Sequence, residues 1–207
     1  MFSEIKNLKA IVINMVYKIL PYRKINIPED EWDKGYSKGD WDYLHSLQQR
    51  MRYKVIACYF SHFGDGGSVL DVGCGDGYLQ EIIAIEGFSK YLGIDISAKA
   101  IESAKYRENE TTKFIKADVN TFQVDERFNV IIFNECIYYF DDPISILNKY
   151  THYLTEDGVF VISMFGSLNR SLDSKLWKKI QSKFTVIDEV IISHGSGKSW
   201  TIKVLDK

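Results

Sequence analysis

The chain has 207 residues, of which 45% are hydrophobic and 26% are charged, with 14 Gly and only 3 Pro. This composition is that of a folded domain and excludes the disordered, collagen-like and disulfide-stapled classes of protein. A total of 26 Lys and Arg against 28 Asp and Glu gives a net charge of −2, which disfavours general binding to nucleic acid. Cys58, Cys74 and Cys136 form no C-x-x-C pair, so we expect reduced thiols in a cytoplasmic protein and predict no metal site.

The first predicted element is an amphipathic helix within residues 2–24. Its apolar side chains recur at spacings of three and four, at Ile5, Leu8, Val12, Met15 and Ile19. Interspersed lysines make the apolar stretch too short to span a bilayer, which needs roughly 20 apolar residues. We expect this helix to pack on the domain or on a partner subunit, which leaves a homodimer open. Its basic charge also keeps open a weak contact with an anionic membrane surface.

A second helix is predicted from Trp41 to Phe63, and beyond it short apolar runs alternate with helical patterns. The predicted strands are residues 68–71, 91–95, 113–117, 128–133 and 158–164, and the predicted helices between them are 76–86, 97–107 and 143–154. The last two apolar runs, 184–192 and 198–205, are separated by five residues, which is too short for a parallel crossover. The sequence therefore predicts an α/β fold: a mostly parallel sheet with helices on both faces, ending in an antiparallel hairpin.

A glycine-rich turn follows the first predicted strand, with glycines at every second position from Gly73 to Gly77. Such a turn lets a nucleotide-like ligand approach the carboxyl ends of the strands. The dinucleotide fingerprint demands a small residue at position 78, where this chain has Tyr78. Asp71 and Asp76 would also repel a pyrophosphate, because like charges at 4 Å repel by roughly 4 kcal/mol at an effective dielectric near 20. The turn therefore favours a cationic ligand group.

The next two predicted strands each have an acid at the carboxyl end: Asp95 ends the second, and Asp118 directly follows the third. Asp95 is placed to accept hydrogen bonds from both ribose hydroxyls, as in sites for an unphosphorylated ribose. Asp118 is placed to accept from an adenine amine, with the N–H of Val119 offered to a ring nitrogen. Together with Asp71 and the glycines, these acids describe a ligand that has a cationic end, a ribose and an adenine, but no phosphates.

Five blocks of the sequence, residues 69–79, 91–97, 115–119, 128–143 and 154–163, resemble the class I S-adenosylmethionine-dependent methyltransferases. The resemblance implies a Rossmann-like sheet of seven strands in the order 3-2-1-4-5-7-6, with strand 7 antiparallel, and S-adenosylmethionine as the cofactor. We expect residues 1–63 to form an N-terminal helical lid or extension and residues 64–207 to form the methyltransferase domain. The implied cofactor-binding residues are Asp71, Gly73, Gly75, Asp95, Ile96, Asp118, Val119 and Asn134. Arg52 is a candidate partner for the methionine carboxylate, because arginine matches a carboxylate in bidentate geometry.

The segment after the fourth predicted strand is expected to face the methyl group. A general base is useful only if the acceptor is a hydroxyl or a protonated amine. Glu135 is the first candidate for this base, followed by Tyr138, Tyr139 and, in the late hairpin, His194. Packing against the cofactor is an alternative role for the two tyrosines.

The methyl acceptor is the least defined part of this hypothesis. Adenine-N6 methyltransferases of nucleic acids carry prolines after strand four, and residues 134–137 contain none, so a DNA acceptor is not expected. Residues 47–53 and 135–143 look most like the nodulation-type N-methyltransferases and related enzymes that modify glycans. We therefore expect methylation at N or O of a small molecule, with a sugar, amino-sugar or glycan precursor favoured. Two alternatives stay open: a non-catalytic S-adenosylmethionine-binding module that acts through a partner protein, and a nucleotide-dependent oxidoreductase.

Overall fold

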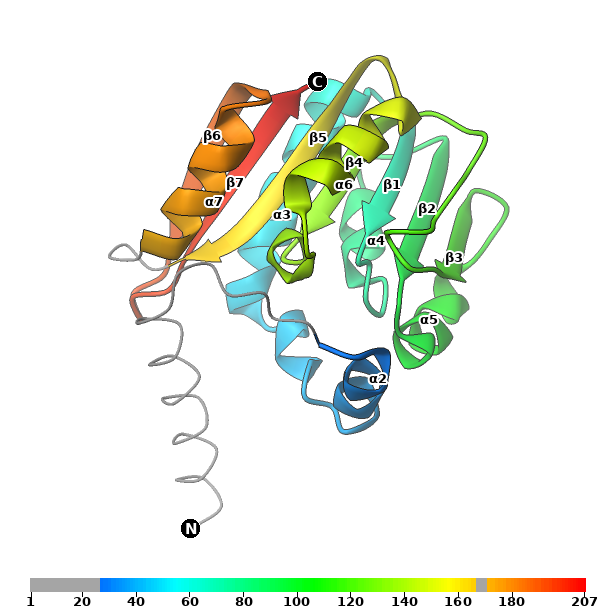
Figure 1. The fold of residues 1–207 in the computed structure, drawn as a ribbon. Coiled ribbons are helices and arrows are strands. Elements are labelled where there is room, and N and C mark those ends of the chain that lie inside the picture. The colour runs from blue at the N-terminus through cyan, green and yellow to red at the C-terminus, as the bar shows by residue number, and fades with distance from the viewer. Residues whose placement is uncertain (1–26, 167–170) are drawn as a thin grey trace.

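In the computed structural model, which describes residues 27–166 and 171–207, seven strands form one sheet (Figure 1). Their order is β3-β2-β1-β4-β5-β7-β6, and β7 runs antiparallel to both of its neighbours while the other pairs are parallel. The strands are β1 Ser68–Val72, β2 Lys90–Asp95, β3 Thr112–Lys116, β4 Phe128–Asn134, β5 Leu154–Gly166, β6 Thr185–Ser193 and β7 Ser199–Asp206. The predicted sheet, its strand order and its terminal hairpin are confirmed. The predicted helix within residues 2–24 lies outside the described residues.

Helices cover both faces of this sheet. The six described α-helices are α2 Glu29–Ser37, α3 Leu47–Gly64, α4 Tyr78–Ile83, α5 Ala98–Ala104, α6 Pro143–Tyr150 and α7 Ser171–Gln181, and the short 3₁₀ turns are η1 Asp42–His45, η2 Lys105–Arg107, η3 Ile137–Tyr139 and η4 Thr151–Tyr153. One core cluster joins the sheet to α3, α4 and α5, and a second joins the opposite face to α6 and α7. The central strands are buried on both sides, which explains why they read as continuous apolar runs.

Two helices begin with the caps that their sequences predict. The Ser97 hydroxyl accepts a hydrogen bond from the Ala100 N–H at 3.1 Å, at the start of α5. The Asp142 carboxylate accepts from the Ser145 N–H at 3.3 Å, and Pro143 occupies the first turn of α6. Capping therefore accounts for the acid before Pro143.

The structure corrects the predicted helix from Trp41 to Phe63. Residues 42–45 form η1, and Ser46 then takes an extended backbone with ψ of 154°, so α3 begins only at Leu47. The helices α2 and α7 were not expected from apolar periodicity. In α2 the available signals were Pro28 before the first turn and the acids Glu29–Glu31 within it.

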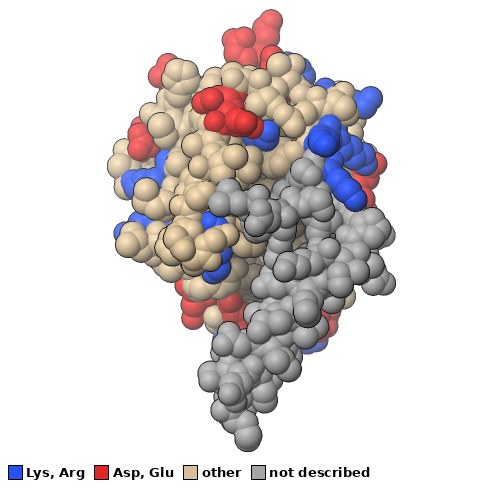
Figure 2. Space-filling view, turned by 90° about the vertical axis from the view of Figure 1, so that its left-hand side faces the viewer, with Lys and Arg blue, Asp and Glu red and all other residues tan. Residues whose placement is uncertain are grey.

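The described surface carries charges of both signs. In Figure 2, small separate groups of acidic and basic side chains lie among a mostly uncharged surface, in keeping with the net charge of −2. Within residues 27–166 and 171–207, no helix combines the length and apolar character needed to cross a membrane.

Candidate cofactor and acceptor site

The carboxyl ends of the parallel strands meet at one edge of the sheet, and α2 lies at that edge in Figure 1. After β1 the chain leads to β2 on one side of the sheet, and after β4 it leads to β5 on the other side. The ends of β1 and β4 therefore form the switch point where α/β folds bind ligands. The glycine turn lies here, and Gly73, Gly75 and Gly77 have φ values of 70°, 58° and 78°. These left-handed angles explain why glycines occupy the turn.

Asp71, at this switch point, points into the protein interior. Its side chain is buried, and the Tyr91 hydroxyl donates to Oδ2 at 2.5 Å. The other oxygen, Oδ1, is buried without a hydrogen-bond partner among the described residues. Burial raises the pKa of this carboxyl to about 7, with the Tyr91 hydrogen bond opposing the shift.

Asp95 lies at the end of β2 and holds the glycine turn. Its two oxygens accept hydrogen bonds from the backbone N–H groups of Gly75 and Ser97, each at 2.9 Å. Burial raises the pKa of Asp95 to about 6. Each carboxylate oxygen has a second lone pair, so these contacts leave capacity for further donors. Ile96 follows directly and is half-buried.

The predicted base-binding residues lie beyond β3. Asp118 Oδ1 accepts from the backbone N–H and the side-chain amide of Asn120, both at 2.8 Å, which closes a local turn. The Val119 carbonyl accepts from the Tyr150 hydroxyl at 3.2 Å and from Lys149 Nζ at 3.3 Å. These contacts fix the backbone just beyond β3, near the carboxyl end of β2.

The helix α2 crosses this edge. Asp33 Oδ1 accepts from the Ser97 hydroxyl at 2.6 Å and from the Lys99 N–H at 3.1 Å, which attaches α2 to the start of α5. Trp32 packs edge-on against Tyr139 in η3, with ring centroids 5.0 Å apart. The two contacts place α2 over the ends of the strands, from β2 to the segment after β4.

The Tyr36 hydroxyl of the same helix lies close to the glycine turn. A Cβ built on Gly75 would come within 2.6 Å of this oxygen. The glycine turn and α2 therefore approach each other so closely that a side chain at position 75 does not fit.

Glu135 and Arg52, predicted for two different roles, contact each other. The Arg52 guanidinium Nη1 lies 3.3 Å from Glu135 Oε1, and both side chains are largely withdrawn from solvent. Glu135 Oε1 also accepts from the Ser163 hydroxyl at 2.8 Å. Oε2 accepts from the Phe165 N–H at 2.9 Å and from the Tyr138 hydroxyl at 3.0 Å. Both oxygens are thus engaged, and Glu135 itself has a left-handed backbone with φ of 62°.

The other predicted catalytic residues, Tyr139 and His194, lie in different elements. Tyr139 lies in η3 beside Tyr138 and packs on Trp32 of α2. His194 lies in the exposed turn between β6 and β7, where its Nδ1 is 2.8 Å from the Ser196 hydroxyl. The structure therefore brings Glu135, Arg52 and the two tyrosines together and leaves His194 on a separate turn.

A family model described as a methyltransferase domain matches residues 63–203. The chain belongs to this methyltransferase family. The resemblance to class I S-adenosylmethionine-dependent methyltransferases seen in the five sequence blocks is confirmed, because the match covers all five blocks and the sheet has the strand order implied by that resemblance.

Individual relatives are distant from this methyltransferase. A malonyl-[acyl-carrier protein] O-methyltransferase of Bacillus anthracis is 25% identical over 156 residues, covering 73% of this chain and 55% of the relative. A ubiquinone biosynthesis O-methyltransferase of Pasteurella multocida is 31% identical over 160 residues, covering 70% of this chain and 62% of the relative. The chain spans about half the length of the curated relatives it matches.

A solved structure with a similar fold is the N-methyltransferase NodS of Bradyrhizobium japonicum WM9 in complex with S-adenosyl-L-homocysteine. The TM-score is 0.69 at 17% identity, and the alignment covers 86% of this chain and 96% of the NodS chain. At this identity the similarity concerns the fold.

Buried polar atoms without partners gather at the site. Among the described residues, seven buried side-chain N or O atoms have no hydrogen-bond partner: Trp41 Nε1, Gln49 Oε1, Arg52 Nε, Asp71 Oδ1, Asn134 Oδ1, Thr155 Oγ1 and Trp177 Nε1. The first five belong to the ends of β1 and β4 or to the elements that cover them. Because a buried polar group without a partner costs roughly 1–3 kcal/mol, such clustering indicates a place where a ligand supplies the missing partners. Sequence reasoning assigned no role to Gln49, which lies in a polar stretch of α3, and it missed Ser163, a single polar residue in an apolar strand.

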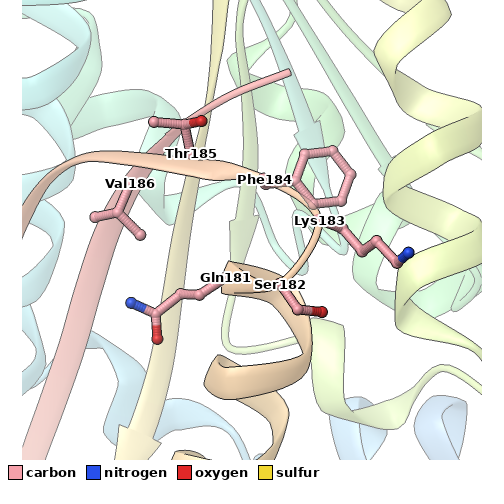
Figure 3. Close-up of a pocket in the computed structure, with 6 residues that line it drawn as sticks. All are labelled: Gln181, Ser182, Lys183, Phe184, Thr185 and Val186. Carbon is pink, nitrogen blue, oxygen red and sulfur yellow. The ribbon is translucent and has the colours of Figure 1, made fainter.

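A separate depression lies at the opposite edge of the sheet. It is lined by residues 181–186, between the end of α7 and the start of β6 (Figure 3). Because β6 runs in the same direction as β5, its first residues lie far from the carboxyl ends of the parallel strands. This depression is therefore not part of the candidate site.

Proposed function

We propose that this methyltransferase uses S-adenosylmethionine to methylate a nitrogen or oxygen atom of a small acceptor, with a sugar, amino-sugar or glycan precursor favoured. The observation that carries the proposal is the pair of unpartnered buried oxygens, Asp71 Oδ1 and Asn134 Oδ1, on neighbouring strands at the switch point. Both are acceptors, and Asp71 also carries negative charge when it is ionised. An ammonium group, such as the methionine end of the cofactor carries, can donate to oxygens of both kinds.

The other predicted cofactor residues, apart from Arg52, lie along the same edge of the sheet, in the order in which the cofactor's ribose and adenine follow its methionine end. Asp95, at the end of β2, would accept from the ribose hydroxyls, with Ile96 beside it. Asp118 and Val119, just beyond β3, would contact the adenine. The left-handed glycines between β1 and α4 leave room for the ligand backbone to approach. The residues present therefore fit S-adenosylmethionine.

When bound, S-adenosylmethionine supplies a methyl group on a sulfonium: the carbon–sulfur bond breaks, its electron pair stays on sulfur, and a lone pair of the acceptor forms the new bond. Because this leaving group is already activated, positioning supplies most of the catalysis by the protein. The helix α2 crosses the edge where the cofactor would bind. Trp32 and Tyr139 narrow the space between α2 and η3.

The contacts of Glu135 favour a positioning role over the predicted role as base. Its carboxylate accepts from Ser163, Phe165 and Tyr138, and it is paired with Arg52. These contacts hold η3 and the end of β4 in one arrangement. A hydroxyl or ammonium acceptor also has to lose a proton, and for this step Tyr139 and His194 stay predictions.

Two observations support the proposed acceptor. The relatives from Bacillus anthracis and Pasteurella multocida are both named O-methyltransferases, which supports oxygen as the methylated atom. The aromatic rings of Trp41, Trp32 and Tyr139 pack on one another beside the edge, and such aromatic side chains are suited to contact a ring-shaped acceptor.

A transfer assay tests the proposal. Methyl-labelled S-adenosylmethionine is incubated with the protein and a panel of sugars, amino-sugars and phenols, and labelled product is separated and counted. We expect product with the wild type and with Asp125→Ala, an exposed control. Asp95→Ala is expected to lose at least about 90% of the rate, since it lacks the ribose partner. Binding of the cofactor with no product from any acceptor would favour the non-catalytic module instead.

A further inference from the structure

Two buried polar side chains of α3, Gln49 and Arg52, are not accounted for by the residues proposed to hold the cofactor: Arg52, predicted as a partner of the methionine carboxylate, pairs with Glu135. Gln49 is 5% exposed and Arg52 is 1% exposed, although both residue types are usually found at the surface. Gln49 Oε1 and Arg52 Nε have no hydrogen-bond partner among the described residues. Gln49 Oε1 therefore lacks a hydrogen-bond donor, and Arg52 Nε lacks an acceptor.

The geometry of α3 brings these two atoms to one place. Residues three apart on an α-helix are neighbours on the same face, so Gln49 and Arg52 project side by side. Arg52 reaches the end of β4, since its Nη1 lies 3.3 Å from Glu135 Oε1. Glu135 in turn accepts from Ser163, which lies opposite Asn134 in the pairing of β4 with β5. The pair therefore faces the carboxyl end of β4 and β5.

This location belongs to the acceptor rather than to the cofactor. Asp71, Asp95 and Asp118 distribute the cofactor over the ends of β1, β2 and β3. Asn134, at the end of β4, is shared with the methionine end of the cofactor, so the end of β5 and the adjoining side of β4 are left for the second substrate. The methyl group passes between these two halves of the edge.

The charge around Gln49 and Arg52 defines the group that fits. The Arg52 guanidinium is already balanced by the Glu135 carboxylate, so the location carries no excess charge. A carboxylate or a fully ionised phosphate has no proton to donate to Gln49 Oε1, and an ammonium has no lone pair for Arg52 Nε. A hydroxyl does both at once, because it donates one hydrogen bond and accepts others.

We propose that Gln49 and Arg52 recognise a hydroxyl of the acceptor that neighbours the atom to be methylated, so that the substrates of this enzyme are vicinal diols, catechols or amino alcohols. The inference rests on the proposed function and narrows its acceptor class. Recognition of this kind discriminates strongly, because an analogue that lacks the hydroxyl leaves two buried polar atoms without partners.

Binding of matched probes to the protein loaded with S-adenosylhomocysteine tests the inference. The probe pairs are catechol against phenol and trans-2-aminocyclohexanol against cyclohexylamine, each followed by tryptophan fluorescence and calorimetry. In the wild type, we expect the hydroxyl-bearing member of at least one pair to bind at least tenfold tighter. In Gln49→Met, which keeps the size of the side chain but removes its oxygen, that preference should fall to less than twofold.

Two further variants make the test specific. Gln48→Met alters the adjacent residue, whose amide bonds Ser196 in the β6–β7 turn, and should keep the full preference. Gln49→Glu keeps an acceptor oxygen and should keep the preference for the hydroxyl. Equal binding within both pairs, an unchanged preference in Gln49→Met, or tighter binding of benzoate than of phenol would overturn the inference. If S-adenosylhomocysteine itself fails to bind, the proposed function fails first.

Discussion

The guanidinium of Arg52 lies 3.3 Å from the carboxylate of Glu135, and the pair joins α3 to the end of β4. Arg52 is almost wholly buried, so the loss of one partner leaves a charge in an apolar environment. We expect Arg52→Met to lower the free energy of unfolding by about 3–5 kcal/mol in urea titrations. Lys54→Met, on the exposed side of the same helix, should change it by less than about 0.5 kcal/mol.

A double-mutant cycle separates this pair from simple loss of packing. Arg52→Met combined with Glu135→Gln removes both charges and should be more stable than the sum of the single effects predicts. Strict additivity of the two substitutions would contradict the interaction. In that case Arg52 would stabilise the domain only through its contact with the Tyr53 ring.

A second prediction concerns the attachment of α2. Asp33 accepts from Ser97 and from the backbone of Lys99, and the Ser97 hydrogen bond is the main reason why the pKa of Asp33 lies below its usual value. We expect Asp33→Ala to increase hydrogen exchange in residues 29–37 and to speed release of S-adenosylhomocysteine roughly tenfold, since about 1 kcal/mol per hydrogen bond is lost. Glu31→Ala, which removes an exposed ion pair with Lys34, is the matched control. Equal release rates from the two variants would show that this contact does not hold the cofactor.

The buried carboxyl of Asp71 predicts a pH dependence of stability. Its pKa is about 7 in the folded protein against 3.8 ordinarily, so folding favours the protonated form. The stability associated with this group is therefore fully present below about pH 4 and is lost as the pH rises through about 7. Between about pH 5 and pH 8, the wild type should lose on the order of 2 kcal/mol relative to Asp71→Asn in unfolding titrations without cofactor. A difference between the two proteins that stays constant across this range would show that Asp71 is not buried as described.

The close approach of α2 to the glycine turn predicts a fourth result. In Gly75→Ala, the new methyl group would lie 2.6 Å from the Tyr36 hydroxyl at a backbone φ of 58°. In Gly66→Ala, the φ of 71° is similarly unfavourable, but no atom lies within 4 Å. Both variants should lose about 1 kcal/mol of stability from the left-handed backbone. Only Gly75→Ala should weaken binding of S-adenosylhomocysteine by more than tenfold, and equal effects on binding would contradict the described contact.

The sequence was most informative about the sheet. Strands such as β4 are buried on both faces, so residues 128–133 form an apolar run that local pattern detects. The final hairpin followed from the short connection alone. By contrast, α2 is mostly charged, and Trp32 and Asp33 are fixed by contacts with η3 and α5, far along the chain. Contacts between segments that are far apart along the chain cannot be predicted from the periodicity of neighbouring residues.

The sequence predicts where the residues of the candidate site lie in the fold, but it does not predict which of their side chains contact one another. Asp71 and Asp95 lie at the strand ends where the glycine turn and the alternation of elements place them. The pairing of Arg52 with Glu135 depends on how α3 docks over β4, and the burial of Gln49 depends on the same docking. A single sequence does not determine that docking, so these residues were assigned separate roles or none.

The most direct measurement is calorimetric titration of this protein with S-adenosylhomocysteine and, separately, with NAD. We predict binding of one S-adenosylhomocysteine per chain, at least a tenfold loss of affinity in Asp95→Ala, and no detectable heat with NAD. Heat with NAD, or none with S-adenosylhomocysteine, would contradict the assignment of this edge of the sheet to a phosphate-free adenosine cofactor.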